Sequence, residues 1–121
     1  MKYLRGGHSF RSREYKKGDY IAREGDIGKE AFLITSGKIE ISKTENEIKT
    51  VFAELSEGAV IGEMSVITNS PRSADICCLT GVKVNVITEK TVNDELKNIS
   101  PWMKKIVTSL SDKLQKTNEK I

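Results

Sequence analysis

Apolar and polar residues alternate along short stretches of the first two thirds of the chain, and glycines separate these stretches. KIEIS, residues 38–42, places its two isoleucines on one face, and VKVNV, residues 82–86, repeats the same period after the Thr80-Gly81 turn. A period of two is typical of a strand with one buried face. Further strands are predicted at Ala31 to Thr35, Phe10 to Tyr15, Tyr20 to Arg23, Ile48 to Leu55 and Asp75 to Leu79.

The connections between these segments are short and rich in glycine. Ser36-Gly37 lies between two predicted strands and is a two-residue hairpin signal. No helical pattern separates successive strands, as a parallel α/β sheet would require. We therefore predict a mainly β fold of antiparallel strands, in the form of a small sandwich, barrel or jelly roll.

The pattern changes after residue 87. Thr88 is a suitable N-cap for a helix through about Asn98, and Ser100-Pro101 is a good start for a second helix. Two interpretations of that helix stay open: it covers its own β domain, or it forms the seam of a parallel dimer. Trp102 is predicted to anchor it by packing, with stacking over a purine as the alternative. The seam consists of Met103, Val107, Leu110, Leu114 and Ile121, with Thr117 as its polar member.

The length of 121 residues allows one compact domain and is too short for two. A hydrophobic content of 37% is enough for a folded core. We predict an N-terminal linker or tail at 1–8, the β domain at 9–87 and C-terminal helices at 88–121. No apolar run approaches the roughly 20 residues that span a bilayer, and the start of the chain lacks the apolar segment of a secretory signal. We expect a cytoplasmic protein.

Charge and side-chain inventory exclude several function classes. The net charge is +3, and the whole excess of basic residues lies in 101–121, where a solvated helix face explains it. We therefore expect no direct nucleic-acid binding. Cys77 and Cys78 are adjacent and cannot easily form a disulfide, so we expect one in the core and one at the surface. A single histidine, His8, cannot supply a cupin-type metal centre or a Ser-His-Asp relay. No metal, cofactor or catalytic activity is predicted.

One cation stands apart from the others. Between Lys49 and Lys83 the only basic residue is Arg72, which lies in the largely apolar stretch GAVIGEMSVITNSPRSADICCL. An isolated cation needs a partner if it is buried. Arg72 could be a surface residue that pairs with Asp75 or Glu63, or it could bind an anionic ligand.

The residues before Arg72 favour the anionic ligand. Gly62 permits a close backbone approach, and residues 63–67 can form a short helix whose free N–H groups attract an anion. Pro71 stiffens the return of the chain, so these donors and one guanidinium can converge on a singly charged phosphodiester. Glu63 fits beside an anion if the ligand also offers a hydroxyl, as a ribose next to a cyclised phosphate does; alternatively it is only an acid favoured at a helix N-terminus.

Together these residues resemble the phosphate-binding cassette of cyclic nucleotide-binding domains. Ile61-Gly62-Glu63-Met64-Ser65 is followed by Pro71-Arg72-Ser73-Ala74 at the spacing that this family uses. Gly18-Asp19, Glu24-Gly25-Asp26 and FLITSG, residues 32–37, are similar to the strand and turn pattern of the same family. The family includes the catabolite activator protein, cyclic-nucleotide-dependent kinases and cyclic-nucleotide-gated channels, and the resemblance covers about residues 9–110.

The resemblance implies an antiparallel β-roll, or double-stranded β-helix, with a short cassette helix and C-terminal helices. It implies that Glu63 accepts the ribose 2′-hydroxyl and that Arg72 pairs with the cyclic phosphate. The remaining implied contacts are the backbone amides near Met64, Ser65 and Ala74 and the Ser73 hydroxyl around the phosphate, with Ile41, Phe52 and Ile61 against the base and sugar. Ser73 favours cyclic AMP over cyclic GMP, because relatives that prefer cyclic GMP often have threonine there.

The leading functional hypothesis is therefore a non-enzymatic sensor domain. Ligand binding would shift the cassette and the C-terminal helices, which would close over the base or change a contact. The expected partners are a second copy, bound through residues 101–121, or an effector domain or protein. The alternative is a ligand-free β-roll that serves dimerisation or protein docking.

Overall fold

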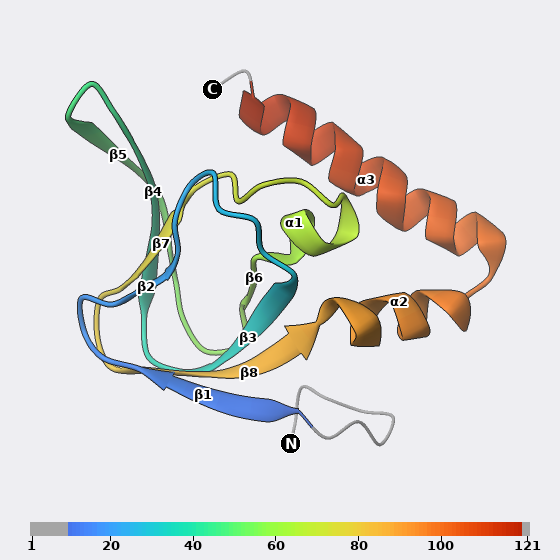
Figure 1. Ribbon diagram of the computed structural model, residues 1–121, viewed down its shortest axis with the longest axis horizontal. Helices are drawn as coiled ribbons and strands as arrows, with labels where there is room; N and C mark the ends of the chain where they lie inside the picture. The colour runs from blue at the N-terminus through green and yellow to red at the C-terminus, as the bar shows by residue number, and fades with distance from the viewer. Residues whose placement is uncertain (1–9, 120–121) are drawn as a thin grey trace.

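The computed structural model describes residues 10–119, which form two antiparallel sheets followed by two helices (Figure 1). The elements are β1 (Arg11–Tyr15), β2 (Tyr20–Ala22), β3 (Glu30–Ser36), β4 (Ile39–Glu45), β5 (Ile48–Leu55), β6 (Val60–Ile61), α1 (Glu63–Ile67), β7 (Asp75–Cys78), β8 (Val82–Thr88), α2 (Glu89–Lys97) and α3 (Pro101–Glu119). The strand orders are β1-β8-β3-β6 and β2-β7-β4-β5. The predicted antiparallel β-roll with a short cassette helix is confirmed.

The core lies between the apolar faces of the two sheets. Phe32 and Ile34 of β3, Val84 of β8, Ile39 of β4 and Ile76 of β7 belong to one buried cluster. β3 and β8 are the two inner strands of their sheet, so both of their edges are hydrogen-bonded. This position explains why Ala31 to Ile34 are all buried, whereas an edge strand such as β5 is largely exposed.

The prediction of a hairpin at Ser36-Gly37 is wrong. β3 pairs with β6 and β8, and β4 pairs with β5 and β7, so this tight turn carries the chain from one sheet to the other. Gly37 has a φ of 98°, and a Cβ there would lie 2.2 Å from the carbonyl oxygen of Gly81 in the corner between β7 and β8. The glycine therefore serves the close packing of two corners, and strands distant in sequence occupy the edges that a hairpin would use.

The actual two-residue hairpin joins β4 to β5 through Asn46 and Glu47. Both residues have positive φ, 52° and 67°, as a type I′ turn requires. Alternation predicts the strand on either side of this turn, but no glycine marks the turn itself. β6 was not predicted, because its two residues are too few to show a period.

The two C-terminal helices begin where the capping residues predicted. The Thr88 hydroxyl accepts a hydrogen bond from the backbone N–H of Thr91 at 3.2 Å, and α2 ends with Asn98 as its C-cap. α3 begins at Pro101 and passes over α1 in Figure 1, and these two helices are in contact. The helix positions follow from local capping and are confirmed.

The apolar residues of α3 are mostly exposed. Trp102 is 62% exposed and Leu110 55%, so the prediction that Trp102 anchors the helix by packing is wrong. Val107 is half-buried, and the side chains of Leu114 and Thr117 lie outside the described part of the chain, as do residues 1–9 and 120–121. The dimer seam stays a prediction.

No helix among residues 10–119 is long and apolar enough to span a bilayer. Within the same residues, no group of three or more histidine, cysteine, aspartate or glutamate side chains is placed to hold a metal ion. Cys78 is buried and Cys77 is half-buried, which confirms that the two side chains point to different environments.

Candidate functional site

The predicted cassette residues line one cavity of about 220 Å³. Gly62, which follows β6 and has a φ of 74°, turns the chain into the single turn of α1, and the loop after Pro71 contributes Arg72, Ser73 and Ala74 to the same cavity. The lining residues are Ile41, Leu55, Val60, Ile61, Gly62, Glu63, Met64, Ser65, Arg72, Ser73, Ala74 and Ile76. All eight predicted cassette residues and Ile41 are therefore brought together.

Phe52 does not line this cavity. It borders a second cavity nearer the tip of the β4–β5 hairpin, together with Lys43, Ile48 and Thr50. The pairing of β4 with β5 shifts where Ile41 opposes Ala53 and Ser42 opposes Val51, so Phe52 is the extra residue of a bulge. The resemblance implied that Phe52 lies against the base or sugar, whereas at this bulge it lines the second cavity.

Arg72 turns its guanidinium inward and is only 8% exposed. Nη1 donates to the carbonyl oxygen of Gly62 at 2.9 Å and to Oγ of Ser65 at 2.6 Å. Nη2 donates to the carbonyl oxygen of Glu30 at 2.7 Å. The guanidinium also lies over the Phe32 ring, 5.7 Å from its centroid. These contacts fix the cation between α1 and β3, at the wall of the cavity.

The backbone around Arg72 is held equally firmly. Its N–H donates to the carbonyl oxygen of Asp26, and its own carbonyl oxygen accepts from the N–H of Gly25, both at 2.8 Å. The cassette loop is thereby pinned to the loop between β2 and β3. The position of Arg72 consequently depends on two segments that are far apart in sequence, residues 25–30 and residues 62–65.

Within residues 10–119, the three hydrogen-bond acceptors of the Arg72 guanidinium are neutral. Burial lowers the pKa of Arg72 from its ordinary value, and the carboxylates of Glu30, Asp26 and Glu63 oppose this shift from a distance. An arginine remains protonated in proteins under ordinary conditions. The site therefore holds a buried positive charge, and two of its five N–H groups are not used by the three bonds described above.

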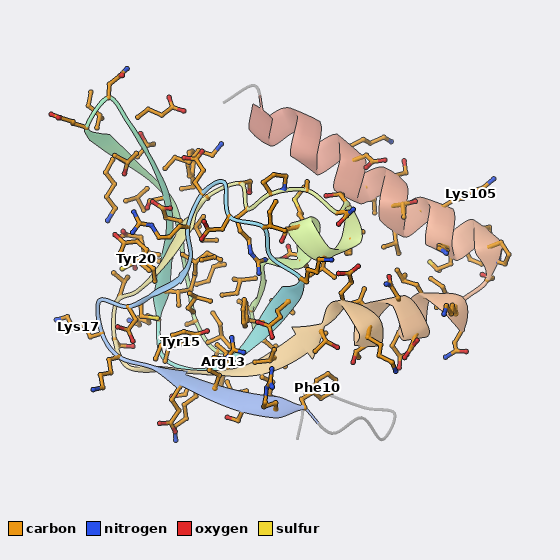
Figure 2. All side chains as sticks on the ribbon, viewed as in Figure 1. Phe10, Arg13, Tyr15, Lys17, Tyr20 and Lys105 are labelled. Atoms are coloured by element: carbon orange, nitrogen blue, oxygen red, sulfur yellow. The ribbon has the colours of Figure 1, made fainter. Side chains whose placement is uncertain are left out.

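The carboxylates of Glu30 and Asp75 are bound to partners other than Arg72. The Glu30 carboxylate accepts from Arg13, labelled in Figure 2, at 3.2 and 3.3 Å, and it also contacts Arg11 at 3.4 Å. Asp75 accepts from the backbone N–H of Glu24 at 2.8 Å and pairs with Arg23. Asp75 is thus no partner of Arg72, and the interpretation of Arg72 as an ion-paired surface residue is wrong.

Glu63 is exposed and lines the same cavity as Arg72. It is the first residue of α1, so it also occupies a position where the helix dipole favours an acid. Both interpretations of Glu63 are compatible with this position. The cavity as a whole offers a buried cation, a free carboxylate and an apolar wall.

Sequence reasoning missed three apolar residues of the wall, Leu55, Val60 and Ile76. Leu55 pairs with Ile39 across β4 and β5, and Ile76 pairs with Ile41 across β4 and β7. The alternation within each strand could have placed them on the inner face. Which strands are neighbours, however, could not be read from alternation.

The chain matches the family model described as "Cyclic nucleotide-binding domain" over residues 12–98. This match covers most of the chain and includes the whole cavity wall. The chain belongs to the cyclic nucleotide-binding domain family. A domain of this family is a ligand-binding regulatory module and is not itself catalytic.

Curated relatives carry this domain within much longer proteins. The chain is 35% identical over 68 residues to a cAMP-dependent protein kinase regulatory subunit of Mycosarcoma maydis, a match that covers 56% of this chain and 13% of that protein. It is 32% identical over 68 residues to a cGMP-dependent protein kinase of Plasmodium berghei (strain Anka), covering 56% and 8%. The chain therefore spans 13% or less of the length of these two relatives.

Solved structures show the same fold. The cAMP-bound form of EAL enzyme Bd1971 matches with a TM-score of 0.84 at 28% identity, covering 89% of this chain and 29% of that one. The cGMP-bound form of that enzyme matches with a TM-score of 0.83 at 26% identity, covering 91% and 30%. The Thermus thermophilus Catabolite Activator Protein matches at 0.74, 22% identity and 92% and 53% coverage, which supports the fold alone.

Proposed function

We propose that this cyclic nucleotide-binding domain binds cyclic AMP and that Arg72 pairs with the cyclic phosphate. The observation that carries the proposal is a buried guanidinium that lines a cavity and whose acceptors, among the residues that the structure describes, are neutral. A buried cation is costly without a counter-charge. A phosphodiester in the cavity supplies one negative charge and oxygen acceptors for this cation.

The other cavity residues have complementary roles in this proposal. Glu63 accepts the ribose 2′-hydroxyl, and the backbone amides near Met64, Ser65 and Ala74, with the Ser73 hydroxyl, complete the phosphate shell. Gly62 permits the close approach, and Ile61 and Ile41 form the apolar wall against sugar and base. Phe52 lies one cavity further along β4 and β5, where it would meet only a part of the ligand that extends beyond this wall.

Base preference is the finer part of the proposal. Ser73 supports cyclic AMP, whereas the similar structures include both a cAMP-bound and a cGMP-bound form of one enzyme. We expect cyclic AMP to bind more tightly than cyclic GMP. Ser73→Thr should narrow or reverse that difference, because relatives that prefer cyclic GMP often have threonine at this position.

The first experiment is a calorimetric titration of the chain with cyclic AMP, cyclic GMP and 5′-AMP. A single arginine suits a singly charged diester, so we expect micromolar or tighter binding of cyclic AMP, about −8 kcal/mol, and much weaker binding of the doubly charged monoester. Equal affinity for cyclic AMP and 5′-AMP would contradict a site built for a cyclic phosphate. No heat with any of the three would refute the proposal.

We propose that the structural change caused by ligand binding passes from the cassette to the C-terminal helices. α1 carries cassette residues and contacts both α2 and α3, so a shift of α1 on binding would be felt by both helices. A second copy of the chain or an effector would then receive the change through α3. Hydrogen exchange of the amides of residues 88–119 tests this, and unchanged exchange at saturating cyclic AMP would contradict it.

A ligand-free docking or dimerisation module is the second candidate. The observation in its favour is the exposed apolar surface of α3, which includes Trp102, Ile106 and Leu110. Sedimentation together with the titration separates the two: a stable dimer that binds no nucleotide would support this candidate. We propose neither a catalytic activity nor direct nucleic-acid binding, and the cytoplasmic location stays a prediction.

A further inference from the structure

Gly28, in the loop between β2 and β3, lies directly against the side chain of Arg72. A Cβ built on Gly28 would be 2.0 Å from Nε, 2.2 Å from Cζ and 2.3 Å from Nη2 of Arg72. Real Cβ atoms do not approach other heavy atoms so closely, so one of the two side chains would have to move. Any residue larger than glycine at position 28 is therefore incompatible with the observed guanidinium position.

Backbone conformation does not explain this glycine. Gly18 and Gly25 have strongly positive φ and open space around their Cα atoms, so they meet a conformational need. Gly28 has no φ in the left-handed range, and alanine could adopt its backbone without strain. Glycine is needed at position 28 because a side chain there would overlap with Arg72.

The Arg72 guanidinium cannot simply step aside. It is buried, and its three hydrogen bonds reach Gly62, Ser65 and Glu30. Gly62 confines it from another side, since a Cβ there would lie 2.5 Å from Nη1. We call the space bounded by Gly28, Glu30, Gly62 and Ser65 the guanidinium site.

We propose that Gly28 is a positioning residue for ligand binding: the absence of its side chain sets where the Arg72 guanidinium lies, and thereby sets the affinity for the phosphate. The proposal rests on the proposed function for its binding consequence, because Gly28 itself need not touch the nucleotide. A displaced guanidinium loses the alignment of its N–H groups with an anion, and charge-assisted hydrogen bonds depend strongly on that alignment.

The test compares Gly28→Ala with Gly81→Ala. Gly81 also lies outside the left-handed φ range, but the nearest atom to its Cβ would be the Tyr15 carbonyl oxygen at 4.0 Å. Both variants add one methyl group to a loop, and only one of them meets Arg72. In calorimetry with cyclic AMP we expect Gly28→Ala to lose about tenfold or more in affinity and Gly81→Ala to stay within about twofold of the unmodified chain. Equal affinities in the two variants would overturn the proposal.

A double-mutant cycle on thermal stability gives a readout that needs no ligand. Gly28→Ala should lower the melting temperature by about 5 °C or more in the presence of Arg72. In the Arg72→Ala background the methyl group has room, so Gly28→Ala should leave the melting temperature unchanged or raise it, because alanine restricts the unfolded chain more than glycine does. Additive effects would overturn the proposal.

The two readouts separate failure of this proposal from failure of the proposed function. If the unmodified chain binds no cyclic nucleotide but the stability cycle is strongly non-additive, Gly28 positions Arg72 and the ligand assignment is wrong. If cyclic AMP binds and the cycle is additive, the ligand assignment stands and the role of Gly28 is refuted. Should Gly28→Ala fail to fold, recovery of folding in Gly28→Ala/Arg72→Ala supports the steric contact, and no recovery contradicts it.

Discussion

Arg72 and Trp102 break the usual rules of burial in opposite directions. The cassette buries a charged side chain that is 8% exposed, whereas α3 exposes an indole that is 62% exposed. The buried charge is held by three hydrogen bonds to two segments, Glu30 of β3 and residues 62–65, whereas the exposed apolar side chain is on a helix that mainly contacts the one-turn α1. A tightly constrained polar group indicates a site prepared for a ligand, and an exposed apolar face indicates a surface that is still to be covered.

The largest effect is expected from Arg72→Ala. Removing the guanidinium leaves the bound phosphate desolvated and unpaired, which should cost on the order of 2–4 kcal/mol of binding free energy for cyclic AMP. Titration calorimetry measures this loss. Arg23→Ala is the matched control, because Arg23 is exposed and pairs with Asp75 instead of lining the cavity. A loss below tenfold for Arg72→Ala would contradict the assigned role.

Ser65→Ala should have the next largest effect. It removes one of the three acceptors of Arg72 while leaving the cavity wall almost unchanged. We expect a loss of about 1 kcal/mol in stability and a weakening of cyclic AMP binding by about fivefold, because the guanidinium is less firmly oriented. Thermal unfolding and titration measure the two effects. Ser109→Ala, on the exposed side of α3, is the control and should change neither; if the two variants behaved alike, the Ser65 hydroxyl would have no orienting role.

Cys78 shows how a buried group without charge behaves. Burial, with smaller contributions from Cys77 and Asp19, raises the pKa of the Cys78 thiol to about 11 from its ordinary value of 9.0. Below about pH 9 the thiol is neutral in both states, so its contribution to stability is fully present. Between about pH 9 and 11 the unfolded chain ionises and the folded chain does not, so this contribution is lost as pH rises.

Chemical denaturation at pH 8.5 and at pH 10 tests whether the stability contribution of the Cys78 thiol falls as pH rises. The stability of the unmodified chain should fall more than that of Cys78→Ala, by about 1 kcal/mol at pH 10. Cys77→Ala should keep the steeper loss, because Cys77 is only half-buried. Parallel curves for the unmodified chain and Cys78→Ala would show that the thiol is not protected by burial.

The smallest effect on stability is expected from a substitution on the exposed face of α3. Leu110 is 55% exposed, so Leu110→Gln should change the free energy of unfolding by no more than about 0.5 kcal/mol. Ile34→Ala, in the fully buried core of β3, provides the contrast and should cost about 2–5 kcal/mol. Denaturant unfolding at low protein concentration measures both. A loss for Leu110→Gln similar to that for Ile34→Ala would show that α3 is already covered, and sedimentation at higher concentration would show whether a second copy covers it.

Much of the fold followed from local patterns. The limits of β5 and the starts of both C-terminal helices agree with the alternation and capping residues, since these depend on neighbours in the chain. The pairing of the strands, by contrast, could not be predicted from local patterns. Ser36-Gly37 has the composition of a hairpin turn, yet β6 and β8 occupy the edges of β3, and the competition among distant strands decided the outcome.

The candidate site likewise contains residues that local sequence patterns predicted and residues that they did not. The cassette residues from Ile61 to Ser65 and from Arg72 to Ala74 were predicted because their spacing is a local property, and the cavity unites them. Phe52, which only the resemblance assigned to the site, lies at a bulge of β5 and lines the second cavity. Gly28 carried no signal of its own, because glycine in a loop ordinarily indicates a turn and gives no measure of how close another side chain lies.

The sequence by itself determined most of the strands, the helix caps, Arg72 as the only basic residue between Lys49 and Lys83, and the resemblance to the family. Only the tertiary structure decided that Arg72 is buried against neutral acceptors, that Gly28 leaves room for it and that Trp102 is exposed. The physical reason is the distance along the chain over which each interaction acts. Periodicity and capping act within a few residues, whereas the guanidinium site is assembled from residues near positions 28, 30 and 62–65, and its shape exists only once both sheets have closed.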